Sequence, residues 1–525
     1  GPARGDGSGI WGEFKDGCLG AIRLGADDVR GGLSGAGSQI AALAASETPV
    51  NAVDIRSRRT LVLGPFDDSF SGEGGDEAVD IAATLEASTC PHAPYSVDGP
   101  LKDEDADLQV MRSQYLYGVV AMATHGEAMF SGMSAAAYAR YAWDHAGAQE
   151  LLWSGQSAEC KILCNAATPC GTDADCSSGE CVLISQGSGK CVDRTQMDLR
   201  KGRVVLTEDT WAITAPFVSR HARLLFPGSL VYLGACRTLF NGTLVAEYLA
   251  AGAQAIVGFS DYVHGSYAYD VGKKLFEQLV EDGKLVGASF IELPTQDPAG
   301  APYGRVRLFG QTNLNIDVPG LINPDFELGD LTGWSRAGDG RVIRQLGDSL
   351  ESGTSSVDGK FMGIISTGLG FTTTTGEINQ TFCIPAGQTS ITFYWKMLSA
   401  EFKSYCGSSF QDSFEATLEG DAGTLPMKDI RIDDLCYYDD GDCQSCANPP
   451  VGCQCGQQYV GLLKSDVSFE DGDIDGSTYM TAWQTHKQDI SFFAGGGKVT
   501  IRVFSSDVTD SIYDTAILID GIEFE

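Results

Sequence analysis

The sequence predicts two domains, an α/β domain built on a parallel sheet and then an all-β sandwich. Short apolar runs alternate with helical repeats over residues 58–317, which is typical of a sheet covered by helices. Beyond about residue 320 the composition shifts to Thr, Ser, Phe and Gly, and many short runs of alternating polarity lie between turn residues. A cysteine-dense stretch at about 145–205 interrupts the first pattern and predicts a disulfide-rich insert.

Each element follows from its local pattern. Apolar runs predict parallel strands at 60–64, 119–123, 230–233 and 255–259. Helical spacing predicts helices over 78–85, 135–143 and 244–251, and a further one whose apolar stripe is Tyr267, Val271, Leu275 and Leu279. Residues 1–57 have weak periodicity, and we expect them to form an N-terminal arm or pro-segment. Asp317-Val-Pro-Gly320 predicts a linker, so the second domain spans 320–525.

The charge of the chain argues against two classes of partner. It has 36 Lys and Arg against 70 Asp and Glu, a formal net charge of −34. Such an acidic surface disfavours nucleic acid and anionic lipid as partners. No run of 18 apolar residues occurs, so we expect no membrane span. The chain begins Gly1-Pro2, and we expect this not to be the start of its gene.

Sixteen cysteines are present, six within 160–191 and five within 436–455. Clusters without a helical or strand period indicate disulfides in an oxidising compartment, so we expect a secreted or cell-surface protein. In the first cluster three disulfides are favoured over a zinc site, because no His and no Cys-x-x-Cys pair occurs there. Outside the clusters, we expect Cys18 to pair with Cys90.

Two of the predicted strands lead into reactive side chains. The run 119–123 continues as Thr124-His125-Gly126, and the run 230–233 continues as Gly234-Ala235-Cys236. The carboxyl ends of parallel strands meet at one edge of the sheet, where ligands bind. A His and a Cys at that edge form a candidate base and nucleophile. The alternatives are a buried core cysteine and a core histidine whose hydrogen bonds are satisfied.

These two strand ends, with Ala251-Gly252-Ala253 and Val257-Gly258 after them, resemble the caspase-like cysteine peptidases, which include the gingipains, clostripain, legumain and separase. The resemblance covers about residues 58–316. It implies a caspase-haemoglobinase-like fold and a cysteine endopeptidase that needs no cofactor for catalysis. His125 and Cys236 are 111 residues apart (236 − 125), and about 50 without the insert, which is the spacing seen in caspases.

The resemblance also implies a role for each residue. Cys236 would attack the peptide carbonyl, and His125 would carry a proton to the leaving amine. The backbone N–H groups of Gly126 and Cys236 would form the oxyanion hole, with no acidic third member. Many members of the group are zymogens that cut themselves, and we expect the same here. The basic residues that could be cut are Arg56, Arg58, Arg59, Arg194, Arg200, Lys201 and Arg203.

Acidic residues lie where the resembling families line the pocket for the residue before the scissile bond. These places are the loop after the first strand, with Asp67 and Asp68, and the segment after the strand that follows the cysteine, with Asp261. Asp270 is a second candidate there. Because a carboxylate favours Arg or Lys, we predict cleavage after these residues. The alternative is that these acids form an ordinary solvated surface.

The second domain resembles carbohydrate-binding-like jelly rolls at its first and last strands. The first carries Asn323-Pro-Asp-Phe-Glu327, and the last carries Ile519-Asp520-Gly521. In that family a calcium ion often ties these strands together, so the resemblance implies Glu327 and Asp520 as ligands of a structural Ca²⁺. The alternative is two ordinary surface acids. Residues 471–476 are similar to the start of an EF-hand, but Ala482 replaces its Glu, which predicts an acidic turn.

Two functions therefore stay open. The first is a secreted cysteine endopeptidase that acts on protein or peptide substrates and docks through its sandwich to a glycan or cell surface. The second is a catalytically inactive caspase fold that serves as an adhesin or surface-associated glycan-binding protein.

Overall fold

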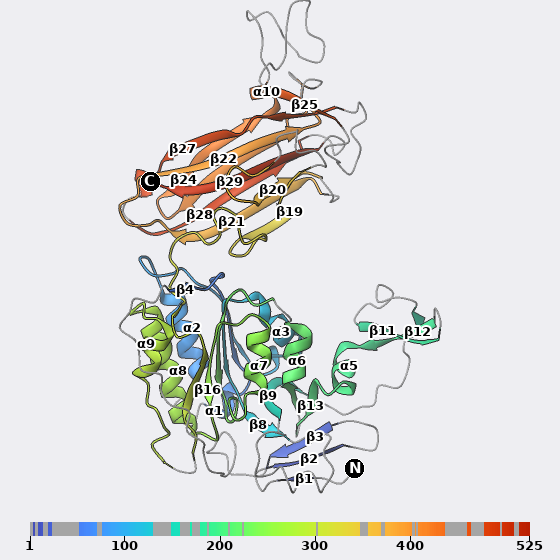
Figure 1. Ribbon diagram of the computed structural model, residues 1–525, viewed down its shortest axis with the longest axis vertical. Helices are drawn as coiled ribbons and strands as arrows, with labels where there is room; N and C mark the ends of the chain where they lie inside the picture. The colour runs from blue at the N-terminus through green and yellow to red at the C-terminus, as the bar shows by residue number, and fades with distance from the viewer. Residues whose placement is uncertain are drawn as a thin grey trace, which may run out of the picture. The chain divides into compact units, whose positions relative to one another are not determined.

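The computed structural model divides the chain into two compact units (Figure 1). The first comprises residues 1–88 and 95–317, and the second comprises 89–94 and 318–525. The structure describes residues 52–70, 76–129, 149–157, 188–207, 210–222, 225–300, 303–346, 355–368, 373–401, 405, 408–435, 477–493, 496–508 and 514–525, and the strand segments 4–5, 9–13, 19–23, 169–170, 179–185 and 459–463.

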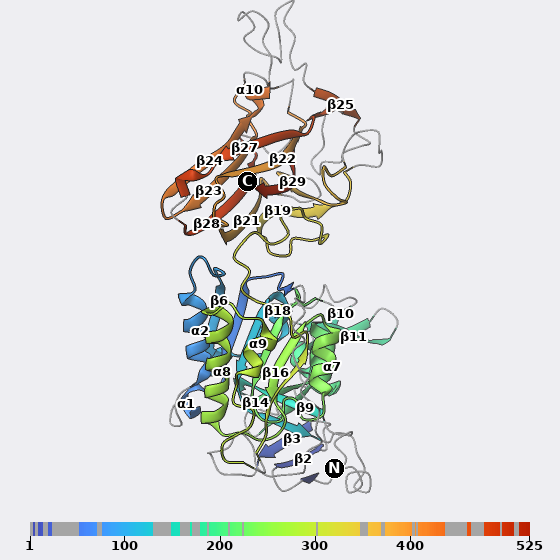
Figure 2. The same ribbon diagram turned by 60° about the vertical axis from the view of Figure 1, so that its left-hand side comes forward.

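In the described part of the first unit, the central sheet has six strands in the order β17-β16-β15-β7-β5-β6 (Figure 2). Neighbouring strands from β6 to β16 are parallel, and β17 is antiparallel to β16, so the sheet is mixed. Strand β6 is added on one side of β5, and the later strands β7, β15 and β16 are added on the other side. The strand order therefore changes direction between β5 and β7, as in doubly wound folds. The strands are β5 (Arg59–Gly64), β6 (Ser96–Lys102), β7 (Val119–Ala123), β15 (Leu230–Gly234), β16 (Ala255–Phe259) and β17 (Val306–Gly310).

Helices cover both faces of this sheet, which explains why every residue of β7, β15 and β16 is buried. Helices α2 and α8 pack together on one face, and α3, α6 and α7 lie on the other (Figures 1 and 2). The predicted apolar stripe of α8 is buried. The helix expected at 135–143 lies outside the described residues. The helices are α1 (Asp67–Phe70), α2 (Glu77–Ala87), α3 (Leu108–Ser113), α6 (Ala215–His221), α7 (Thr243–Ala250), α8 (Gly265–Val280) and α9 (Val286–Ile291).

A second sheet of the first unit has the order β1-β2-β3-β13-β14-β9-β8. It takes strands from residues 1–57 and from the expected insert, where β9 carries the apolar run Leu151-Leu152-Trp153. The strands are β1 (Arg4–Gly5), β2 (Gly9–Glu13), β3 (Leu19–Arg23), β8 (Gly126–Met129), β9 (Gln149–Ser157), β13 (Val204–Leu206) and β14 (Thr210–Thr214). Smaller elements are β4 (Val53–Asp54) with β18 (Leu314–Asn315), and β10 (Pro169–Cys170), β11 (Gly179–Ser185), β12 (Ser188–Asp193) and α5 (Arg194–Arg200).

The second unit is an antiparallel β-sandwich of the jelly-roll kind, as the sequence predicts. Alternate residues of β21 and β28 are buried, which is the period of a strand with one face in the core. Large apolar side chains such as Phe393, Trp395 and Phe414 fill that core. The elements are β19 (Ser335–Ile343), β20 (Met362–Ser366), β21 (Thr375–Cys383), β22 (Ser390–Ser399), β23 (Ser413–Gly420), β24 (Gly423–Arg431), α10 (Ile432–Leu435), β25 (Tyr459–Leu463), β26 (Ser477–Thr481), β27 (Gln484–Asp489), β28 (Lys498–Ser506) and β29 (Thr515–Phe524).

One disulfide corrects a sequence-based expectation. Cys90 pairs with Cys383 of β21 and not with Cys18. The segment 89–94 leaves the end of α2 and belongs to the second unit, which brings its cysteine to the sandwich. Sequence spacing could not reveal that excursion. The side chains of the two cysteine clusters and the turn 471–476 lie outside the described residues. In the part of the chain that is described, no helix has the length and apolar character needed to cross a membrane.

Candidate active site

The two predicted strand ends lie side by side at the carboxyl edge of the central sheet. Strands β7 and β15 are parallel neighbours whose register runs from Val119 opposite Leu230 to Ala123 opposite Gly234. The N–H of Thr124 continues this pairing and donates to Gly234 O at 3.2 Å. His125 and Cys236 each come two residues after the last registered pair. The sheet therefore delivers both residues to adjacent positions, beside the point where the strand order reverses.

Gly126 is packed against the cysteine loop. A Cβ on Gly126 would lie 2.2 Å from the carbonyl oxygen of Cys236 and 3.1 Å from Cβ of Ala235, so no larger residue fits. Trp153 N donates to His125 O at 3.1 Å, and Gly126 faces Leu152 in the ladder of β8 and β9. Gly126 and Leu152 thus form a non-hydrogen-bonded pair of this antiparallel ladder, so the N–H of Gly126 does not donate to β9. This is the group expected in the oxyanion hole.

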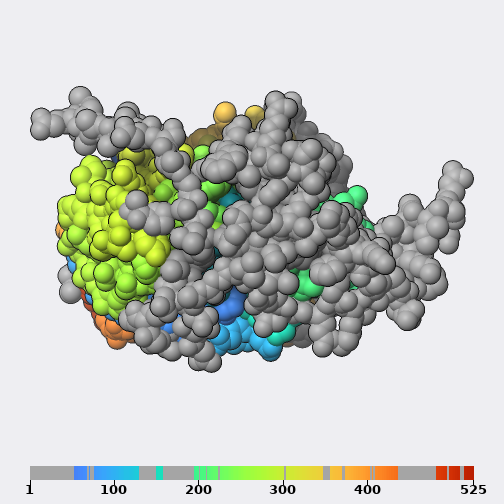
Figure 3. All heavy atoms as spheres, turned by 90° about the horizontal axis from the view of Figure 1, so that it is seen from below, coloured from blue at the N-terminus to red at the C-terminus, as the bar shows by residue number. Residues whose placement is uncertain are grey.

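The thiol of Cys236 is fully buried and is not part of a disulfide. Its Sγ accepts a hydrogen bond from Val263 N at 3.3 Å and donates to Val263 O at 3.6 Å. The His125 ring packs against the rings of Phe66 and Phe70, with centroids 4.6 and 5.1 Å away. The sulfur is thus shielded from solvent in this arrangement. Figure 3 views the molecule from this end, with the yellow-green segment around α8 at the left.

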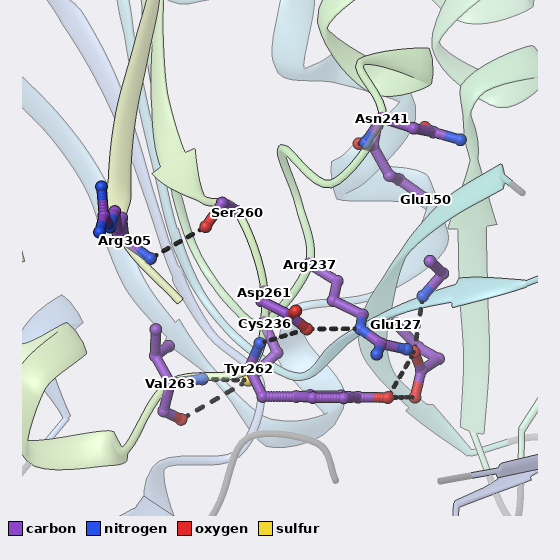
Figure 4. A network of polar contacts seen from close by, with 11 residues as sticks. Glu127, Glu150, Cys236, Arg237, Asn241, Ser260, Asp261, Tyr262, Val263 and Arg305 are labelled. Atoms are coloured by element: carbon purple, nitrogen blue, oxygen red, sulfur yellow. Dashed lines mark hydrogen bonds and ion pairs between the residues drawn. The ribbon is translucent and has the colours of Figure 1, made fainter. Parts of the chain in front are cut away.

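A buried ionic cluster at this edge joins β8 to the loops after β15 and β16 (Figure 4). Arg237, which follows Cys236, bonds Glu127 Oε1 through Nη1 at 2.8 Å and Asp261 Oδ1 through Nε at 2.9 Å. The Tyr262 hydroxyl lies 3.0 Å from both oxygens of Glu127. The guanidinium carbon of Arg237 lies 3.7 Å from the centre of the Tyr262 ring. We call these four residues the Arg237 cluster.

The charges of the Arg237 cluster hold its arginine ionised. Burial alone lowers the pKa of Arg237, but Glu127, Tyr262 and Asp261 outweigh burial and raise that pKa above its usual value. Nearby, the buried carboxylate of Glu150 accepts hydrogen bonds from Asn241 N, Gly242 N and Leu244 N. Burial raises the pKa of Glu150, and these N–H groups at the start of α7 oppose it. Glu150 therefore anchors α7 behind the cysteine loop.

The acids predicted for the substrate pocket lie in different settings. Asp67 pairs with Lys102 at 2.8 Å in a partly exposed ion pair next to Phe66. Asp261 is buried and bound to Arg237, and Asp270 is exposed on α8. The side chain of Asp68 lies outside the described residues. Sequence reasoning missed Glu127 and Arg237, although opposite charges directly beside both reactive strand ends were a signal for them.

The carboxylates of Glu327 and Asp520 both accept hydrogen bonds from the backbone of one turn of the sandwich, residues 357–361. Glu327 Oε1 accepts from Lys360 N and Phe361 N at 2.5 and 2.7 Å, and Asp520 Oδ2 accepts from Val357 N and Asp358 N at 2.7 and 3.0 Å. Burial raises the pKa of Asp520 to about 6, against the N–H donors. Among the described residues, no three His, Cys, Asp or Glu side chains are grouped to hold a metal. Main-chain donors satisfy these carboxylates, so the calcium ion stays a prediction.

Comparison with known proteins gives no family and only structural matches of low TM-score. No family model matches the chain, and no curated protein does. Among solved structures, TmCBM61 in complex with β-1,4-galactotriose matches 40% of this chain and 100% of its own, with 14% identity and a TM-score of 0.21. CBM28, a cellulose-specific carbohydrate-binding module, matches 39% and 94%, with 12% identity and a TM-score of 0.20. The K1 cleaved adhesin domain of Lys-gingipain from Porphyromonas gingivalis W83 matches 38% and 95%, with 12% identity and a TM-score of 0.20.

Proposed function

We propose that the chain is a caspase-like cysteine endopeptidase in which Cys236 is the nucleophile and His125 the base. One observation carries the proposal: the register of β7 and β15 brings these residues to adjacent strand ends. Contact between Gly126 and the Cys236 carbonyl supports it, because the two loops touch there. The doubly wound strand order supports a caspase-haemoglobinase-like fold.

The proposed reaction uses these groups in sequence. His125 takes the thiol proton, and the sulfur of Cys236 attacks the peptide carbonyl. The N–H groups of Gly126 and Cys236 stabilise the oxyanion, and His125 returns the proton to the leaving amine. Water then hydrolyses the thioester. The buried sulfur must first become accessible to substrate, which agrees with the proposal that the chain is a zymogen.

Asp67 is the acid best able to bind a substrate Arg or Lys. Its ion pair with Lys102 is partly exposed, and such pairs contribute only about 0–1 kcal/mol. The pair of Asp261 with Arg237 is buried, and breaking a buried pair costs about 3–5 kcal/mol. A substrate cation can therefore displace Lys102 from Asp67 far more easily than Arg237 from Asp261. Asp67 also adjoins Phe66, which touches the His125 ring.

The basic residues proposed as processing sites differ in how far they are buried or paired. Arg58 is buried, and Arg59 begins β5, which pairs on both sides with other strands. Arg203 is bound to Asp198 in an ion pair. Arg56, Arg194 and Lys201 are exposed. Of these we propose Arg194, the first residue of α5 and directly after β12, as a position of self-cleavage.

Active-site labelling tests the peptidase proposal. The full chain should react at Cys236 with a peptidyl acyloxymethyl ketone that carries Arg, and Cys236→Ala should not react. Paired fluorogenic substrates with Arg or Asp before the scissile bond should show preference for Arg. Absence of both labelling and hydrolysis, in protein cut after Arg194 as well as intact protein, would reject the proposal. Preference for Asp would reject the role of Asp67.

A shallow pocket on the sandwich favours glycan binding as a second function of the same chain. Its lining includes Asp421, Phe492 and Lys498, and the Phe492 side chain is 54% exposed. An exposed ring beside a carboxylate and an ammonium group suits a sugar, whose apolar face stacks while its hydroxyls form hydrogen bonds. Binding of the Cys236→Ala chain to a glycan array, lost in Cys236→Ala/Phe492→Ala, would support this function. Equal signals for the two variants would reject this pocket.

A further inference from the structure

We propose that Arg237 is a positioning residue that fixes the reactivity of Cys236 by clamping three strand-end loops together; this rests on the proposed function only in taking Cys236 as the nucleophile. The first is the segment after β7, which carries His125 and continues into β8 with Glu127. The second is the loop after β15, which carries Cys236, and the third is the loop after β16, which carries Asp261. The Arg237 cluster connects all three through side chains.

The backbone at Arg237 needs such a clamp. Its φ is +55°, in the left-handed region that residues other than glycine rarely adopt. Such a conformation persists only where its surroundings hold it, and it is common next to reactive groups. The Arg237 N–H donates to Asp261 O at 3.2 Å, and its side chain bonds Asp261 Oδ1. Asp261, in the loop after β16, thus bonds both the backbone N–H and the guanidinium group of Arg237.

The shape of the arginine suits three partners at once. Its planar fork directs Nη1 to Glu127 and Nε to Asp261, while its face lies on the Tyr262 ring. A lysine carries a single ammonium group and cannot make this set of contacts. All four members of the Arg237 cluster are buried, so water cannot replace the lost bonds. Arg237→Lys therefore keeps the charge but loosens the three loops.

The Arg237 cluster can influence the sulfur of Cys236 in two ways. Arg237 directly follows Cys236, so its backbone fixes the direction of that side chain. Val263, whose N–H donates to Sγ at 3.3 Å, follows Asp261 and Tyr262 of the Arg237 cluster. A donor to sulfur favours the thiolate over the thiol. The opposing contact, donation by the thiol to Val263 O, is longer at 3.6 Å. If Arg237 positions the N–H donor, loosening the clamp moves the pH midpoint of Cys236 alkylation upward.

The experiment compares Arg237→Lys with Arg112→Lys in the full chain. Arg112 has a matched buried ion pair with Asp198, away from the strand ends. Iodoacetamide alkylation of the Cys236 peptide is followed by mass spectrometry across pH, with thermal unfolding in parallel. We expect Arg237→Lys to move the midpoint of the pH–rate profile upward, whereas greater exposure of the buried sulfur would raise the rate at every pH and leave the midpoint in place. Arg112→Lys should lower the melting temperature but leave that profile unchanged.

A second variant guards against misfolding of Arg237→Lys. Tyr262→Phe removes the hydroxyl that bonds Glu127 and keeps the ring, so a smaller shift in the same direction is expected. The inference is overturned if both Arg237→Lys and Tyr262→Phe keep the wild-type profile, or if Arg112→Lys shifts it equally.

Failure of the peptidase proposal gives a different result. A wild-type chain that hydrolyses no peptide and takes no acyloxymethyl ketone rejects the peptidase, while the alkylation profiles still decide the role of Arg237. If the wild-type chain is active, Arg237→Lys should lower kcat at least tenfold with KM changed less than twofold. A change in KM alone would assign Arg237 to substrate binding and overturn the positioning role.

Discussion

The first unit contains two buried ionic clusters that differ in composition and in location. The Arg237 cluster has two carboxylates for one guanidinium and joins loops at strand ends. The other has a single carboxylate, Asp198, which bonds Arg112 at 3.0 Å, Arg203 at 3.2 Å and His221 at 3.0 Å. We call this second group the Asp198 cluster. It joins α5 to α3 and α6 on the helical side of the fold.

The difference shows how similar interactions serve different purposes. Burial alone raises the pKa of Asp198, but His221 and Arg112 outweigh burial and lower that pKa below its usual value. The carboxylate is therefore stably ionised, and no left-handed backbone occurs at Asp198, Arg112, Arg203 or His221. Arg237 combines a left-handed backbone with a place next to a thiol. The Asp198 cluster thus has the features of an interaction that stabilises the fold. The Arg237 cluster has the features of an interaction that positions the residues of the candidate site.

Removing the imidazole should give the largest effect. His125→Ala should lower kcat/KM about a thousandfold, because general acid–base groups contribute about 10² to 10⁴ in rate. The ring is partly exposed and packs on Phe66 and Phe70, so the melting temperature should change little. Steady-state kinetics and calorimetry check this. Retention of activity would assign the proton transfer to another group.

Removing the central acid of the Asp198 cluster should have the largest effect on stability. Asp198→Ala leaves the buried guanidinium of Arg112 and the partly buried one of Arg203 without their carboxylate, which costs about 3–5 kcal/mol. Urea unfolding measures this loss, and kcat of the remaining folded protein should stay within twofold. A strong fall in kcat without a loss of stability would contradict a purely structural role.

The sequence predicted the central elements better than the connections between them. The four apolar runs and the stripe of α8 lie where expected, because strands buried on both faces and amphipathic helices leave strong local patterns. The placement of His125 and Cys236 just after two neighbouring strand ends followed from that order. The antiparallel β17, the second sheet and the Cys90–Cys383 bond could not be predicted, since they depend on contacts between distant segments. Arg237 was missed because its role depends on Glu127 and Asp261.

Asp520 differs from the acids of both ionic clusters, because the hydrogen bonds that its carboxylate accepts come from main-chain N–H groups. Its pKa is raised to about 6 in the folded chain, against about 3.9 when unfolded, so the folded state binds the proton more tightly. Stability of the sandwich should therefore fall by a few degrees in melting temperature as pH rises from 4 to 6. Asp520→Asn should flatten this part of the profile. An unchanged slope would show that other groups cause it.

The same residue tests the calcium prediction. If Asp520 binds Ca²⁺, the ion should raise the melting temperature of the sandwich more at pH 7 than at pH 5, because it binds the ionised carboxylate. Asp520→Asn should abolish that increase. No calcium effect at either pH would leave main-chain hydrogen bonds as the sole task of this carboxylate.

The smallest effect should come from the exposed pair of Lys102 and Asp67. Lys102→Met removes a competitor for Asp67 and should lower KM for Arg substrates about two- to fivefold, equivalent to about 0.4–1 kcal/mol. Arg59→Met, which breaks the exposed pair with Asp98, is the control and should leave KM unchanged. An equal change in both variants would point to the overall charge of the surface.

The cystine between Cys90 and Cys383 gives the chain a second covalent route from its amino-terminal part to its carboxyl-terminal part. A protease that cuts the backbone near residue 317 would leave both fragments on one molecule. They would migrate together in electrophoresis and separate only after a reductant is added. Maturation by cutting there would thus free a new chain end without shedding the sandwich.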